Sequence, residues 1–380
     1  MSTFAVYIAV SVFAADPVQK ALLVASSSAG LWLSLFLVQF VRRYEWSVNW
    51  SAAFVWGAAG LSFGGAALGR ESLGCYLAGV SIGQMAVMMA VPLLSSIYRE
   101  HYPDETRGQL FAIAGVVRKV AAIVAGLMFG WWLEKGLENF VGVLWVYAGA
   151  SFLMVGCVLL VKRVSLERAR EVKLFGAFRH VKEDRPFRRL LMAWMILGTG
   201  NLLNFALFVE YVANPEHGFG LGAAEVSWLT TITPEAAYLL TVFLWGRVFD
   251  RSDFFAVRIV INLFFIVGIL VYFLGPGLWA LYLGIALHGI GKAGGNVAWS
   301  LWVTKFAKAE HVAEYMSVHT FLTGCRGMLA PFAAFLLVGA TSPQVVGLLG
   351  ALLMTVATLM IAWQWRETRA LSSCEQTGEG

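Results

Sequence analysis

The sequence predicts an all-α polytopic membrane protein built from two six-helix bundles related by pseudo-two-fold symmetry. Of its 380 residues, 59% are hydrophobic and only 13% are charged, whereas soluble domains carry about 25% charged residues. The apolar residues form runs of roughly 20, which is enough for a helix to cross the ~30 Å hydrocarbon core of a bilayer. Basic residues are concentrated on alternate connections between these runs, as expected for a chain that crosses a membrane repeatedly.

The basic residues also predict the orientation. Twenty of the 28 Lys and Arg residues fall on one set of connections, and the alternate set holds only Lys20, Arg70 and Lys135. Positive charge near helix ends resists translocation, so the rich set and the C-terminus are expected in the cytoplasm. The net charge of +5 then faces anionic lipid headgroups, and no nucleic-acid partner is expected. The rich set comprises ten residues within 162–189 together with Arg42, Arg43, Arg99, Arg107, Arg247, Arg251, Lys305, Lys308, Arg366 and Arg369.

The predicted spans can be given in chain order. They are 20–41, 50–69, 72–98, 107–133, 139–161, 190–212, 226–249, 256–275, 278–304, 315–339 and 344–365. The first apolar run, Thr3 to Ala14, reaches only about 18 Å at 1.5 Å per residue. We therefore expect an N-terminal bundle (1–161), a cytoplasmic basic linker (162–189), a C-terminal bundle (190–366) and a cytoplasmic tail (367–380).

An internal repeat relates the two halves. Sliding the sequence on itself by 208 positions aligns five spans without a gap and places Arg43 on Arg251 and Arg118 on Arg326. A duplicated six-helix unit explains this alignment, and chance alignment of helices of similar length is the alternative. The repeat implies that the first helix begins before Met1, so at least about ten more apolar residues are expected in frame upstream. A true eleven-helix protein is the other possibility.

Two short motifs lie on the basic connections. Gly246 to Arg251 (GRVFDR) follows the span 226–249, and Pro103 to Gly108 (PDETRG) precedes the span 107–133. With the two six-helix halves and the long basic central loop, they resemble the major facilitator superfamily of secondary transporters. The resemblance implies a cytoplasmic conformational latch at Gly246, Asp250 and Arg251. The equivalent first-half segment, 38–43, lacks the Gly and the Asp, which puts a first-half latch in doubt.

Polar residues inside the spans are the candidates for a solute pathway. Charged groups at a helix centre cost about 2.5 to 3.5 kcal/mol, so they usually face a bundle interior or a cavity. Residues at i, i+4 and i+7 share a helix face, and this spacing gathers several of these residues into stripes. A purely structural role in helix packing is the alternative for each of them. The substrate or coupling candidates are Arg118, Glu235, Lys292, Arg326, His288, Gln84, Asn201, Asn204 and Asn296.

These features predict a secondary transporter rather than an enzyme. No metalloprotease, hydrolase or metal-ligand motif occurs, and Cys75, Cys157, Cys325 and Cys374 show no paired spacing. No cofactor or metal is expected. The expected partners are a small solute, a coupling ion, with a proton at Glu235 favoured, and membrane lipids. We expect a monomer in the bacterial cytoplasmic membrane. A transporter-derived sensor and an intramembrane enzyme are the alternatives.

The sequence also suggests the charge of the solute. Among the central candidates, Arg118, Lys292 and Arg326 are positive and only Glu235 is negative. An excess of positive charge is costly at low dielectric unless an anion or a carboxylate offsets it. Arg can hold a carboxylate or phosphate through two parallel hydrogen bonds. An organic anion or zwitterion is therefore expected as the solute, and pairing of these cations with carboxylates is the alternative.

Overall fold

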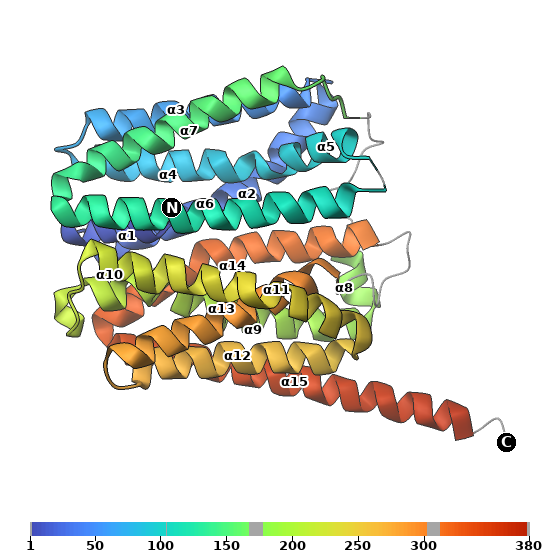
Figure 1. Cartoon of the computed structure of the whole chain (residues 1–380). Helices are drawn as coiled ribbons and strands as arrows, with labels where there is room; N and C mark the ends of the chain where they lie inside the picture. The colour runs from blue at the N-terminus through green and yellow to red at the C-terminus, as the bar shows by residue number, and fades with distance from the viewer. Residues whose placement is uncertain (1, 104, 167–177, 302–311, 378–380) are drawn as a thin grey trace. The chain divides into compact units, whose positions relative to one another are not determined.

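The computed structural model describes residues 2–103, 105–166, 178–301 and 312–377, and in these residues it consists of helices joined by short turns (Figure 1). No strand is formed in this described part, where Ser47 and Ser165 make an isolated β-bridge. The helices are α1 Ser2–Ser11, α2 Pro17–Arg43, α3 Val48–Leu68, α4 Leu73–Met89, α5 Val91–His101, α6 Arg107–Lys135, α7 Phe140–Leu160, α8 Arg179–Glu183, α9 Arg185–Ala213, α10 Ala223–Ser227, α11 Thr233–Arg251, α12 Phe254–Leu274, α13 Gly277–Leu301, α14 Val312–Ala340 and α15 Pro343–Thr377.

Every predicted span overlaps one of these helices. Nine helical segments in the described part are long and apolar enough to cross a membrane. The predicted spans 226–249 and 278–304 are not among the nine. The first is divided between α10, the π-helical turn η4 (Trp228–Ile232) and α11. The second coincides with α13, which carries several polar residues, and its last residues lie outside the described ones.

The helix boundaries differ from the prediction at two places. The span 72–98 is divided at Ala90 into α4 and α5, and Pro92 lies in the first turn of α5, where its missing N–H is tolerated. α9 begins at Arg185, inside the predicted linker. The linker residues 167–177 and the predicted cytoplasmic residues Lys305 and Lys308 lie outside the described part of the chain.

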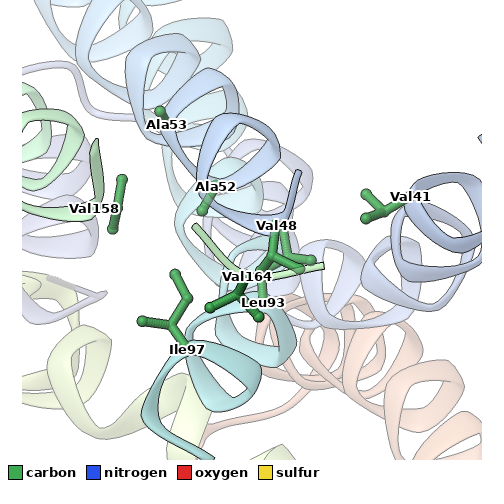
Figure 2. Close-up of a cluster of buried hydrophobic side chains, with 8 residues drawn as sticks. All are labelled: Val41, Val48, Ala52, Ala53, Leu93, Ile97, Val158 and Val164. Atoms are coloured by element: carbon green, nitrogen blue, oxygen red, sulfur yellow. The ribbon is translucent and has the colours of Figure 1, made fainter. Parts of the chain in front are cut away.

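The helices form two compact units, and the first comprises Met1–Val172, Ala206–Thr231 and Gly327–Ala340. In this unit α3 packs on α4 and α7, and α10 packs on α6. Figure 2 shows one of its apolar clusters, in which Val48, Leu93 and Val164 lie close together. Asn49 fixes the end of this cluster, because its side chain donates to the carbonyl of Val158 at 2.8 Å and accepts from the amide of Val164 at 2.8 Å.

The second unit comprises Lys173–Phe205, Ile232–Arg326 and Thr341–Gly380. In it α13 packs on α11 and α12, and α12 packs on α15. Small residues allow the close approach: a Cβ on Gly284 would lie 2.6 Å from the carbonyl oxygen of Gly268, as is common for helices packed in membranes. The two units do not follow the predicted domain boundaries, which stay a prediction.

Candidate functional site

Two polar contacts join α11 and α13 within the second unit. Lys292 Nζ lies 3.2 Å from Glu235 Oε1, and the side chains are 38% and 13% exposed. One turn further along α13, Asn296 Nδ2 donates to the hydroxyl of Tyr238 at 3.3 Å. Three predicted site residues, Glu235, Lys292 and Asn296, therefore lie together. The ion pair is half-exposed on the lysine side, so it is within reach of a proton or a solute.

The local backbone determines where Glu235 lies. The π-helical turn η4 ends at Ile232, and Pro234 opens α11 immediately before the carboxylate. Pro at the start of a helix loses no hydrogen bond, and π-turns contain one extra residue and are frequent at functional sites. α13 approaches closely at this point, since a Cβ on Gly289 would lie 2.5 Å from the carbonyl oxygen of Pro234. The sequence analysis did not foresee the π-turn.

Arg326 lies against a different helix. Its Nη1 donates to the backbone carbonyl of Trp194 on α9 at 2.5 Å, and its side chain is half-buried. The guanidinium fills the space left by the missing side chain of Gly198, where a Cβ would overlap with Arg326. In the described residues Arg326 forms no ion pair with a carboxylate.

A second arginine that was not among the predicted candidates lies beside Trp194. Arg258, in the second turn of α12, is 2% exposed, and its guanidinium carbon lies 4.0 Å from the centre of the Trp194 ring. His319 on α14 is fully buried, and its ring meets Trp194 edge-on at 5.5 Å between centroids. The signal for Arg258 was present in the sequence, as a lone Arg inside the predicted span 256–275.

Three other candidates pack between helices. His288 is buried on α13, and its ring lies edge-on to Phe265 of α12 at 5.0 Å. Gln84 is buried on α4 and accepts a hydrogen bond from Ser27 of α2 at 3.0 Å. Asn204 is fully buried on α9 and donates to the carbonyl of its own helix at Gly200, 2.9 Å away. These positions favour a structural role in helix packing for His288, Gln84 and Asn204.

Asn201 and Arg118 lie apart from these contacts. Asn201 is half-buried on α9, and no described residue donates to its Oδ1, which is itself buried. Arg118 is exposed on α6, in the first unit, and forms no ion pair there with a described residue. The predicted candidates thus do not form one cluster within either unit.

A buried ion pair was missed because Lys20 was assigned to an exterior connection. The structure corrects this: Lys20 lies in the first turns of α2, and its Nζ is 2.7 Å from Glu210 Oε1 on α9. The side chains are only 8% and 2% exposed. Asn214 Nδ2 also donates to Glu210 Oε1, at 2.9 Å, and His217 Nε2 lies 3.4 Å from it. The pair joins helices of the two predicted bundles inside the first compact unit.

Comparison with known proteins identifies the fold. Residues 202–379 match the family model described as Major Facilitator Superfamily. This match covers less than half of the chain, in its C-terminal part. Among solved structures, the nucleoside transporter NupG is 16% identical, with 96% of this chain and 94% of that chain covered and a TM-score of 0.75. The human organic anion transporter MFSD10 is 15% identical, with 90% and 83% covered and a TM-score of 0.64. No curated protein matches the sequence closely enough to count as a relative.

These similar structures confirm the predicted all-α polytopic fold. The family model matched by residues 202–379 agrees with the predicted transporter class. In a third similar structure, a POT family transporter in complex with a thioalcohol-conjugated peptide, the identity is 12%, 96% of this chain and 93% of that chain are covered, and the TM-score is 0.75. In the described residues, no three His, Cys, Asp or Glu side chains gather as they would around a metal ion.

The predicted superfamily latch lies at the end of α11. Asp250 and Arg251 are exposed, and in the described residues neither forms an ion pair. Gly246, one turn earlier, has open space where a side chain would project. A latch that pairs in only one conformational state is compatible with these positions, and its role stays a prediction.

Proposed function

We propose that the protein carries an organic anion or zwitterion by alternating access and that protons bound at Glu235 drive the transport. The observation that carries this proposal is the Glu235–Lys292 ion pair, which joins α11 to α13 at 3.2 Å with the lysine 38% exposed. An ionisable residue inside a transmembrane segment is by default a candidate for function. The absence of a nucleotide-binding loop from the sequence supports coupling to an ion gradient.

Protonation of Glu235 would remove the negative charge that holds Lys292. The lysine could then bind the negative charge of a solute, or its contact with α11 could loosen and change the packing of the two helices. Either response links proton binding to solute movement, because protonation of Glu235 frees a positive charge for the solute or changes the packing of the two helices. The neighbouring Asn296–Tyr238 hydrogen bond adds a polar surface for the solute.

Charge is the argument for an anionic solute. Lys292 is paired with Glu235, whereas Arg326 and Arg258 have no carboxylate partner in the described residues. Similarity of fold does not select a substrate, since the printed names of the similar structures include a nucleoside transporter and an organic anion transporter. The unbalanced positive charge therefore carries the preference for an anion or a zwitterion.

We further propose the bacterial cytoplasmic membrane as the location and a monomer as the working form. The basic connections support a cytoplasmic C-terminus.

Transport in proteoliposomes tests the proposal. Candidate organic anions would be added outside vesicles that contain a trapped pH-sensitive dye, and proton movement would be recorded together with solute uptake. We expect the wild type to move protons with the solute. Glu235→Gln should abolish proton movement and uphill accumulation but retain solute exchange between two loaded compartments. Proton movement that persists in Glu235→Gln would contradict coupling at this residue, and uptake of cations alone would contradict the anionic solute.

A further inference from the structure

In the second unit, two arginines contact the same tryptophan. Arg258 lies over the ring of Trp194 at 4.0 Å, and Arg326 donates to the backbone carbonyl of the same residue at 2.5 Å. His319 contacts the same tryptophan from α14. Arg258 of α12 and Arg326 of α14 thus contact the same tryptophan of α9.

Among the described residues, no carboxylate neutralises either arginine. The described ion pairs involve other cations, and neither Arg258 nor Arg326 has an additional partner among the described residues. The Nε atoms of both arginines are buried and donate to no described acceptor. An arginine cannot lose its proton to avoid this cost, so both groups stay charged.

The carboxylates on the same helices are engaged elsewhere. Glu210 of α9 pairs with Lys20. Asp184, just before α9, accepts a hydrogen bond from Tyr315 at 2.7 Å. Asp253 caps the start of α12, and the side chain of Glu314 on α14 lies outside the described ones. Two unpaired charges in a membrane interior are expensive unless an anion offsets them.

We propose that Arg258 and Arg326 together bind the carboxylate or phosphate group of the transported solute. Arg258 is held rigidly by its contact with Trp194, and Arg326 is half-buried, so it is the side on which a solute can approach. Two planar guanidinium groups offer paired donors that match two oxygens of such a group. Trp194 is a positioning residue, because it contacts both arginines. The proposal rests on the transporter function and adds a residue, Arg258, and a chemical group to it.

The test is a binding measurement that needs no transport. The thermal unfolding midpoint of the purified full-length chain in neutral detergent would be followed with acetate, succinate or inorganic phosphate, added in place of chloride at constant ionic strength. We expect at least one of these anions to stabilise the wild type in a saturable manner. Arg258→Gln and Arg326→Gln should each raise the apparent dissociation constant about tenfold or more, as loss of a hydrogen bond to a charged group does.

Two further variants make the result specific. Arg70→Gln removes one exposed arginine from an exterior connection and should bind anions like the wild type. Arg258→Lys keeps the charge but loses the planar fork, so an intermediate affinity is expected. If Arg258→Gln does not fold, Arg258→Lys and Arg326→Gln together provide the test. The measurement follows anion binding without proton movement, so a failure of proton coupling at Glu235 would not be mistaken for a failure of this site.

Two outcomes would overturn the proposal. One is that the anions do not distinguish the wild type from the arginine variants (Arg258→Gln or Arg258→Lys, and Arg326→Gln). In that case every anion stabilises all of these proteins equally, or no anion stabilises any of them. The other is a stabilisation that depends on these arginines but appears only in lipid nanodiscs containing phosphatidylglycerol, because that result would assign the site to a lipid headgroup.

Discussion

Lys20 and Glu210 form a buried ion pair with 2.7 Å between the ammonium nitrogen and a carboxylate oxygen. The Lys20 ammonium also lies 5.6 Å from the centre of the Phe335 ring. Burying two charges is favourable only when each satisfies the other, and removal of one partner leaves an isolated charge that costs about 3–5 kcal/mol. This pair is therefore a sensitive point for stability.

Single and double substitutions of this pair should behave differently. We expect Lys20→Met to lower the unfolding midpoint of the purified protein strongly, because Glu210 is left charged and buried. Lys20→Met combined with Glu210→Leu should recover most of the loss, since a well-packed apolar pair is often as stable as a buried ion pair. A double variant that stays as unstable as the single one would show that the ion pair itself is favourable, beyond the cost of leaving one charge buried alone.

A side chain at position 198 should displace the guanidinium of Arg326. A methyl group there would occupy the position of the Arg326 guanidinium, and such overpacking costs about 1–3 kcal/mol. Gly198→Ala should therefore lower the unfolding midpoint and weaken anion binding. Arg326→Gln in the Gly198→Ala background should restore the midpoint. Gly149→Ala, on α7 with open space around it, is the matched control and should not destabilise. Unchanged behaviour of Gly198→Ala would mean that Arg326 lies elsewhere.

Asp250→Asn should slow transport without destabilising the protein. The carboxylate is exposed and unpaired among the described residues, and surface substitutions usually change stability by less than about 0.5 kcal/mol. If Asp250 pairs in only one conformational state, its loss shifts the balance between states. Initial uptake rates and unfolding midpoints would be compared with those of Glu183→Gln, which removes another exposed carboxylate. Normal uptake by Asp250→Asn would show that Asp250 does not act as a latch.

The orientation can be tested by labelling single cysteines. In a background without Cys75, Cys157, Cys325 and Cys374, Arg163→Cys would report on the start of the linker and Arg70→Cys on an exterior connection. Both positions are exposed. A membrane-impermeant maleimide should label Arg70→Cys in intact cells and Arg163→Cys only after the cells are opened. The reverse pattern would invert the predicted topology.

The spans were predictable because the bilayer imposes them. A helix that crosses lipid must satisfy its backbone internally and needs about 20 apolar residues, so composition alone locates it within a few residues. Glu235 and Lys292 were also found from sequence, since charges inside such helices are rare. Their pairing with each other was not predictable, because α13 contacts both α11 and α12 and helical spacing does not tell which neighbour a given residue faces.

The missed features depend on tertiary contacts. Arg258 looked like a residue near a helix end, and only the position of Trp194 shows that it is buried beside a second arginine. Lys20 looked like a loop residue, because charge near the start of an apolar run normally marks a connection. Asn204 donates to a carbonyl of its own helix, and Gln84 accepts from Ser27 of a neighbouring helix, so a role for either in the solute pathway stays a prediction. Polarity in a span therefore indicates a partner, and the fold decides whether that partner is a helix or a solute.

The π-turn before α11 affects how the orientation of the Glu235 carboxylate can change between related sequences. A turn of this kind contains one residue more than an α-helical turn, and each residue rotates the following helix by about 100°. The direction of the carboxylate thus depends on the number of residues that precede it, and most single substitutions in η4 would leave it unchanged. Loss of one codon there would turn the carboxylate away from Lys292 while every polar residue of the site remained in the sequence. Relatives that keep all of these residues could therefore differ in coupling through chain length alone.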